Sequence, residues 1–114
     1  MVSEFLMDAD ERMLEFFSEI ADVLQTFGIT RAEAVARVNH AWGNEKFDPY
    51  PDLMCHEEPE YWAHGMYYDD GKGQGGLVPY WEQSPDRSTW QIVPPPPADS
   101  PAWTLPRPQA AHRR

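Results

Sequence analysis

The chain is 114 residues long with a mass of 13.2 kDa, so it has room for one small domain. It is 41% apolar and 13% aromatic, which is enough to bury a core and excludes wholesale disorder. Its 19 acidic and nine basic residues give a net charge of −10. This balance excludes general nucleic-acid binding and disfavours anionic membranes, because both require a surplus of Lys and Arg.

Residues 9–27 carry the clearest periodic signal. Apolar side chains recur there at three- and four-residue spacing and acids fall on the other side, so we expect an amphipathic helix. Asp8 or Asp10 is expected to cap its start, and Gly28 to end it, because glycine adopts the left-handed conformation without a Cβ clash. The apolar positions are Met13, Phe16, Phe17, Ile20, Ala21, Val23, Leu24 and Phe27.

A second helix is predicted over about residues 31–42. Thr30 and Glu33 form a capping-box pattern, in which the Thr side chain accepts from the N3 amide and the Glu side chain reaches back. Glu33 and Arg37 are also a favourable i,i+4 pair, and Gly43 follows the last apolar position. Because the link to the first helix is short, the two helices are expected to form an αα-hairpin.

The helical pattern breaks over residues 45–56, where two prolines predict an irregular connection. Residues 57–60, Glu-Glu-Pro-Glu, are typical of a helix start, since proline is tolerated at the first helical position and acids favour the first turn. Trp62 and Met66 are spaced to form the buried side of this third, short helix. A strand over residues 66–69 is the competing interpretation.

Short strands are predicted in the second half of the chain. The glycine-rich residues 71–76 are expected to join residues 66–69 to residues 77–81 as a β-hairpin, with Pro79 confining the second segment to an edge. Residues 89–93 alternate and are rich in β-formers, so they are expected to form a further short strand.

Residues 94–114 hold seven of the twelve prolines and show no apolar period. We therefore expect a proline-rich flexible tail that is disordered when free, with Pro94–Pro97 extended as polyproline II. Residues 1–93 then form the single small acidic domain. The expected fold class is α+β, mainly α: an N-terminal αα-hairpin, a third short helix, a short β-hairpin or strands, and the tail.

The most metal-like group of side chains is His56, Glu57, Glu60 and His64. On a helix the last three share one face, and His40 is a possible additional ligand. The stretch has no CxxC, HxH or HExxH pattern, and a structural zinc site normally needs four committed ligands. The competing interpretation is an acid-capped helix start with a surface histidine paired to Glu60. We expect no cofactor, and a small metal-assisted enzyme at this cluster is the alternative hypothesis.

Three further motifs lack the context that catalysis or nucleic-acid binding requires. Cys55 and His56 are adjacent, so their side chains diverge, and nothing in the sequence supplies an orienting group or an oxyanion hole. Residues 71–76 lack the GK[ST] ending of a phosphate loop and precede no helical pattern. The two helices within residues 9–42 offer too few basic groups for DNA recognition. We expect no catalytic residue.

Cys55 is the only cysteine, so an intramolecular disulfide is impossible and a disulfide-stapled secreted scaffold is excluded. The first residues lack the basic start and the apolar run of a signal peptide. No apolar run approaches the roughly 20 residues that span a bilayer. We expect a cytoplasmic protein.

Three sequence blocks occur in order along the first half of the chain: EAVARVN at 33–39 with Trp42, HEEPEYWA at 56–63, and two tyrosines at 67–68. This order resembles the EAxxRIN…W, HExxxxWA and YY blocks of a group of small uncharacterised bacterial proteins. The resemblance covers roughly residues 10–70, and it does not extend to the glycine-rich segment or the proline tail. It implies a bacterial, cytosolic origin and assigns no activity.

The acidity is concentrated in the N-terminal part: residues 1–70 hold 16 acids and four bases, whereas residues 71–114 hold three acids and five bases. Such a field steers association with a cationic surface, so we expect a small non-enzymatic interaction module that docks onto or masks a basic protein partner. Immunity proteins and antitoxins have this size and charge, which is an analogy only. The expected partner-binding residues are Glu11, Glu15, Glu19, Asp22, Glu57, Glu58 and Glu60.

Overall fold

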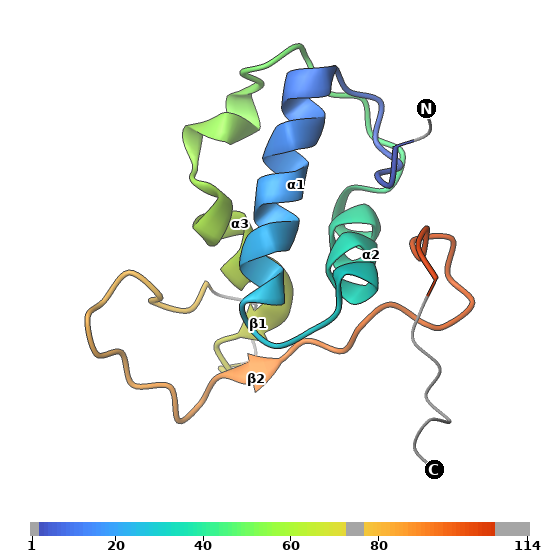
Figure 1. The fold of residues 1–114 in the computed structure, drawn as a ribbon. Helices are drawn as coiled ribbons and strands as arrows, with labels where there is room; N and C mark the ends of the chain where they lie inside the picture. Colours follow the sequence, from blue (N-terminus) through green and yellow to red (C-terminus); the bar gives the residue numbers. More distant parts are fainter. Residues whose placement is uncertain (1–2, 73–76, 107–114) are drawn as a thin grey trace.

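The computed structural model describes residues 3–72 and 77–106 of the chain (Figure 1). Its helical and extended segments confirm the predicted α+β, mainly α class. In chain order they are α1 (Glu11–Gln25), α2 (Arg31–Trp42), a 3-10 helix (Leu53–His56), α3 (Pro59–Tyr67), β1 (Tyr68–Asp69) and β2 (Gln91–Ile92).

Asp10 caps the start of helix α1, and Gly28 lies just beyond its end. The Asp10 carboxylate accepts a hydrogen bond from the Met13 amide at 2.8 Å, which settles the choice between the two predicted caps. The helix ends at Gln25, slightly before the predicted end, and Gly28 follows with a φ of +99° that favours glycine. Val23 and Phe27 are half-buried, and the other six positions of the predicted apolar face are buried: Met13, Phe16, Phe17, Ile20, Ala21 and Leu24.

Helix α2 is capped as predicted, because the Thr30 side chain accepts from the Glu33 amide at 3.1 Å. The predicted Glu33–Arg37 pair is confirmed, with an N···O distance of 2.7 Å. Arg37 is only 5% exposed, and its guanidinium lies 4.7 Å from the centre of the Tyr67 ring. The helix closes at Gly43, as the sequence predicted.

The core lies around α1, with α2 on one side and α3 on the other (Figure 1). Phe17 is fully buried at its centre, and its ring centroid lies 5.9 Å from that of Phe5, 5.4 Å from Trp42 and 5.0 Å from Phe47. Edge-to-face and tilted aromatic pairs of this kind add to the apolar burial. Phe5 and Phe47 bring irregular segments from both ends of the helical hairpin into the same core.

The predicted hairpin between residues 66–69 and 77–81 is wrong. β1 pairs antiparallel with β2 instead: Tyr68 lies opposite Ile92 and Asp69 opposite Gln91. β2 falls within the strand predicted over residues 89–93, so that segment supplies the partner. Residues 77–81 form no strand because Pro79 lacks an amide donor and Val78 is used as a fully buried apolar side chain.

Asn39 binds two separate segments of the chain through three hydrogen bonds. It is 1% exposed, its Oδ1 accepts from the Leu6 amide at 2.8 Å, and its Nδ2 donates to the carbonyls of Glu4 (3.2 Å) and Ala102 (3.0 Å). A buried amide is stable only when its polar atoms have partners. Asn39 therefore holds the N-terminal segment and the proline-rich segment against α2.

The proline-rich segment has no helix or strand over residues 94–106, in keeping with its composition, and it lies beside α2 (Figure 1). The structure shows it in contact with the domain: Pro96 and Ala102 are buried, and Trp103 Nε1 donates to the carbonyls of Pro96 (3.2 Å) and Pro97 (3.0 Å). The rest of the predicted tail, residues 107–114, lies outside the described residues.

Replacing Asn39 with alanine is expected to lower the free energy of unfolding by about 2 kcal/mol or more, because it leaves buried backbone groups without partners. Urea unfolding followed by fluorescence measures this loss. His40→Ala, at the exposed neighbouring position, is the matched control and should change stability by less than about 0.5 kcal/mol. Equal effects of the two substitutions would contradict the role given to Asn39.

Two truncations separate the contribution of the proline-rich segment from that of the residues beyond it. A chain ending at Asp99 loses the Asn39–Ala102 hydrogen bond and the buried Ala102, and should melt about 10 °C lower. A chain ending at Pro106 keeps every described contact and should melt within about 3 °C of the full chain. Equal melting temperatures for the two truncations would show that the segment is not part of the folded unit.

Candidate functional site

The predicted partner-binding acids of α1 lie on its solvent side. Glu11, Glu15, Glu19 and Asp22 are all exposed, opposite the stripe that faces the core. Their spacing of one helical turn brings the side chains onto neighbouring positions of one face. The sequence-based placement of these four side chains on the surface of α1 is therefore confirmed, whereas their role in binding stays a prediction.

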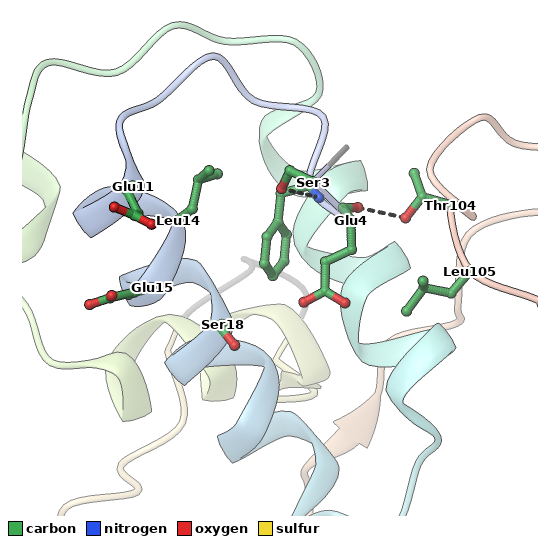
Figure 2. Close-up of a pocket in the computed structure, with 9 residues that line it drawn as sticks. Ser3, Glu4, Glu11, Leu14, Glu15, Ser18, Thr104 and Leu105 are labelled. Atoms are coloured by element: carbon green, nitrogen blue, oxygen red, sulfur yellow. Dashed lines mark hydrogen bonds between the residues drawn. The ribbon is translucent and has the colours of Figure 1, made fainter. Parts of the chain in front are cut away.

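A hollow of about 650 Å³ lies between this helix, the N-terminal segment and the proline-rich segment. Figure 2 shows Glu11 and Glu15 on one side of it and Glu4 and Thr104 on the other. Apolar side chains and hydroxyl groups complete the lining. The full lining is Ser3, Glu4, Phe5, Glu11, Leu14, Glu15, Ser18, Thr104 and Leu105.

The two chain segments that border the hollow are bound to each other. Thr104 Oγ1 donates to the Glu4 carbonyl at 2.6 Å, and the same carbonyl accepts from Asn39 Nδ2 (Figure 2). The Phe5 amide donates to Ser3 Oγ at 3.0 Å, while the Phe5 ring packs on Phe17. The rim is thus fixed by hydrogen bonds and its floor by the core.

Two arginines engage part of the acidic surface. Arg31 reaches Glu4 at 2.6 Å, Asp22 at 2.8 Å and the Ser18 hydroxyl at 2.8 Å. Arg12 pairs with Glu15 at 3.1 Å, with both side chains more than half exposed, so that pair is weak. Within residues 3–72 and 77–106, Glu11 and Glu19 make no ion pair.

The surface around the hollow therefore keeps an excess of negative charge. Five carboxylates of the region are matched by the guanidinium groups of Arg12 and Arg31 alone among the described residues. The other arginine of this part of the chain, Arg37, is committed to Glu33 inside the fold. The five carboxylates belong to Glu4, Glu11, Glu15, Glu19 and Asp22.

The second predicted acidic group, Glu57, Glu58 and Glu60, stands apart from the hollow. It lies at the start of α3, on the other side of α1 from the N-terminal segment (Figure 1), and none of its members lines the hollow. Glu58 accepts a hydrogen bond from the Tyr80 hydroxyl at 3.0 Å. The structure therefore divides the predicted binding residues into two groups.

The metal-ligand candidates do not converge. His64 Nδ1 lies 2.8 Å from the Glu60 carbonyl, and its ring stacks on Tyr80 with centroids 4.4 Å apart. His56 is exposed in the 3-10 helix, and His40 lies on α2 beside Pro94 and Pro96. In the described part of the chain, no three His, Cys, Asp or Glu side chains are grouped so that they can hold a metal ion.

Cys55 lies half-buried beside two methionines, with its Sγ 3.6 Å from Met13 Sδ and 3.8 Å from Met54 Sδ. Burial raises the pKa of the Cys55 thiol, and the carboxylates of Asp52 and Asp10 raise it further. A raised pKa keeps the thiol protonated near neutral pH, which is the opposite of what a cysteine nucleophile needs. Its surroundings are those of a packing residue.

A second, smaller hollow of about 360 Å³ lies between the end of α2 and α3. Trp42, Tyr61, Trp62 and Tyr68 supply aromatic walls, and Leu77 closes one side. Within the described ranges, no acidic, basic, Ser, Thr or Cys side chain lines it, so this part of the lining has no charged group to anchor a ligand. Among the described residues, no helix is long and apolar enough to cross a membrane.

Tyr80 offers a direct test of the contact between Glu58 and the segment after β1. Burial, the hydrogen bond to Glu58 and the charges of Glu58, Glu57 and Glu60 together raise the pKa of Tyr80 to about 12, with burial as the largest cause. Because the folded state favours the neutral phenol, this contribution to stability is complete below pH 10 or so and is lost as the pH rises through about 12.

Glu58→Gln is expected to lower the pKa of Tyr80, because the amide carries no charge. The measurement is the tyrosinate absorbance titration of each protein minus that of the same protein with Tyr80→Phe. Glu60→Gln is the matched control and should lower the pKa less, since Glu60 contributes least of the three acids. An unchanged Tyr80 titration in Glu58→Gln would contradict the contact.

No protein family, curated protein sequence or solved structure matches the chain significantly. The order of its three sequence blocks remains a resemblance that assigns no activity.

Proposed function

We propose that the chain is a small non-enzymatic interaction module that docks onto or masks a basic protein partner through the acidic face of α1. The observation that carries the proposal is the hollow beside α1, where Glu4, Glu11 and Glu15 surround a partly apolar lining. Like charges on one face of a folded protein repel each other, and either solvation or a bound cationic group offsets that repulsion. Binding of a cationic segment removes that repulsion.

The lining of the hollow suits the side chains of Lys and Arg in particular. Leu14, Phe5 and Leu105 provide apolar surface for an aliphatic stem, and the surrounding carboxylates accept hydrogen bonds from its charged end. The volume of about 650 Å³ is large enough for more than one such side chain. An amphipathic basic segment of a protein fits these features better than a small anionic or neutral metabolite does.

Long-range attraction supports the same partner class. The acidic surface steers a cationic partner into encounter, and this effect weakens with salt because the Debye length is about 8 Å at physiological ionic strength. The surplus of acids disfavours nucleic acids and anionic membranes as partners, because these carry negative charge as well. A cytoplasmic site of action fits the single, unpaired Cys55.

The test is affinity capture followed by measurement of Kd with the purified partner. Reversing Glu11, Glu15 and Glu19 to Lys should weaken Kd about tenfold or more at low salt. Asp22 is left unchanged, because its ion pair with Arg31 also holds the N-terminal segment. The substituted residues are exposed, so the melting temperature should remain close to that of the natural protein.

The matched control reverses Glu57 and Glu60, which are also acidic but lie away from the hollow. If docking uses the α1 face, this control should change Kd by less than about threefold. An affinity that is insensitive to salt and to the α1 reversals would contradict the proposal. A larger effect of the Glu57 and Glu60 reversals would move the docking surface to the start of α3.

A further inference from the structure

Three sulfur atoms meet beside the start of α1. Cys55 Sγ lies 3.6 Å from Met13 Sδ and 3.8 Å from Met54 Sδ. Met13 is buried, whereas Met54 and Cys55 are half-buried in the 3-10 helix, so the group can be reached from the side of that helix. None of the three residues lines the hollow beside α1, so this sulfur group is a separate feature.

The composition of the sulfur group is more specific than packing requires. The chain holds one cysteine and five methionines, and two of those methionines contact that cysteine. Leucine fills core positions about as well as methionine does. Apolar packing alone therefore does not call for two thioethers against the thiol.

Hydrogen bonds hold the backbone on both sides of the sulfur group. Asp10 Oδ1 accepts from the Met13 amide at 2.8 Å, and its Oδ2 accepts from the Tyr50 amide at 3.1 Å. The indole of Trp62 donates to the Met54 carbonyl at 3.1 Å. The start of α1 is thus joined to the connection that leads to the 3-10 helix. Donor atoms on a supported backbone lose less freedom when they bind a ligand.

The distances between the sulfur atoms suit a shared metal ion. A metal–sulfur bond is about 2.3 Å long, so two sulfurs on one ion lie about 3.8 Å apart at a tetrahedral angle and about 4.0 Å apart in a trigonal plane. The observed distances of 3.6 and 3.8 Å differ from these values by about 0.4 Å or less. Cys55 can therefore share an ion with either methionine after a small side-chain adjustment.

These donors select a soft, monovalent cation. Thiolate and thioether sulfurs prefer Cu(I), whereas carboxylates and water suit magnesium and calcium. A structural zinc site needs four committed ligands, and within the described ranges no three His, Cys, Asp or Glu side chains are grouped for a metal ion. A single thiolate also balances a single positive charge, so a Cu(I) complex is neutral and costs less to bury than a divalent one.

We propose that Cys55, Met13 and Met54 form a binding site for one Cu(I) ion. The bond between Cys55 Sγ and copper forms as the S–H bond breaks, and the proton passes to water. The two thioethers donate lone pairs and remain neutral. Copper enters and stays in the +1 state, so no oxidant or reductant takes part.

The first test is transfer of Cu(I) from the coloured chelator bicinchoninate to the full-length protein in the absence of oxygen. The protein should take up one equivalent, and the loss of chelator absorbance gives Kd. Met13→Leu and Met54→Leu should each weaken Kd about tenfold, and Cys55→Ser should weaken it about a hundredfold or more. Because leucine has nearly the volume of methionine, both Met variants should stay folded, which their melting temperatures check.

Met66→Leu is the matched control, because Met66 is also half-buried against the core but lies outside the sulfur group, near the end of α3. It should change Kd by less than about twofold. Equal Kd values for the natural protein and both variants of the sulfur group would overturn the proposal, since copper would then bind Cys55 alone. A failure of the protein to take up any copper would overturn it as well.

A second measurement uses the natural protein and needs no substitution. Ag(I) has the charge and the filled d shell of Cu(I) and is not oxidised by air, so it serves as the probe in chloride-free buffer. One equivalent should shift the NMR signals of the Met13 and Met54 methyl groups and leave those of Met7 and Met66 in place. The proposal is overturned if either of the first two signals stays in place, or if all four move equally.

Zn(II) provides the test of metal class. One equivalent should leave all four methyl signals in place, because the sulfur group offers too few ligands for zinc. A response equal to that of Ag(I) would contradict the selection of a soft cation. No protein partner enters any of these measurements, so their outcome is independent of the docking proposed for α1.

Discussion

The arrangement of this protein depends on one buried side-chain amide. Asn39 faces inward from α2, and its three hydrogen bonds reach Leu6, Glu4 and Ala102, which belong to segments that have no regular structure of their own. The helices bury their apolar stripes without it. The borders of the hollow, in contrast, consist of these irregular segments, so a single buried polar group connects the stability of the fold to the shape of its acidic surface.

The use of arginine determines the electrostatic character of that surface. Arg37 is buried against Glu33 and Tyr67, and Arg31 is drawn into contacts with Glu4, Asp22 and Ser18 that hold the N-terminal segment to α1. Both cations thus serve the fold. The exposed acids of α1 are left with little local compensation, and a negative field results from how few basic residues the first part of the chain contains.

Local signals in the sequence predicted the helices well, because caps and apolar periodicity act within a few residues. Asp10, Thr30 and Pro59 each mark a helix start as expected, and the acids of α1 lie on the predicted exposed face. Features that join distant positions were not predictable in this way. The pairing of β1 with β2 across the intervening loop is one, and the contribution of Thr104 and Leu105 to the hollow is another. The sequence did not predict that Asn39 is buried, because the only local signal was its position next to an apolar stripe.

The hydrogen bond between Thr104 and the Glu4 carbonyl joins residues 100 positions apart, and it has a consequence for the order in which the protein matures. Helices α1, α2 and α3 are built from contacts within the first 67 residues, whereas the hollow needs Thr104 and Leu105. Contacts of such long sequence separation form late, because the whole intervening chain must first be ordered. On the ribosome, a nascent chain therefore acquires its helices while its acidic hollow is still missing one wall, and the hollow is completed only after Thr104 and Leu105 have been synthesised.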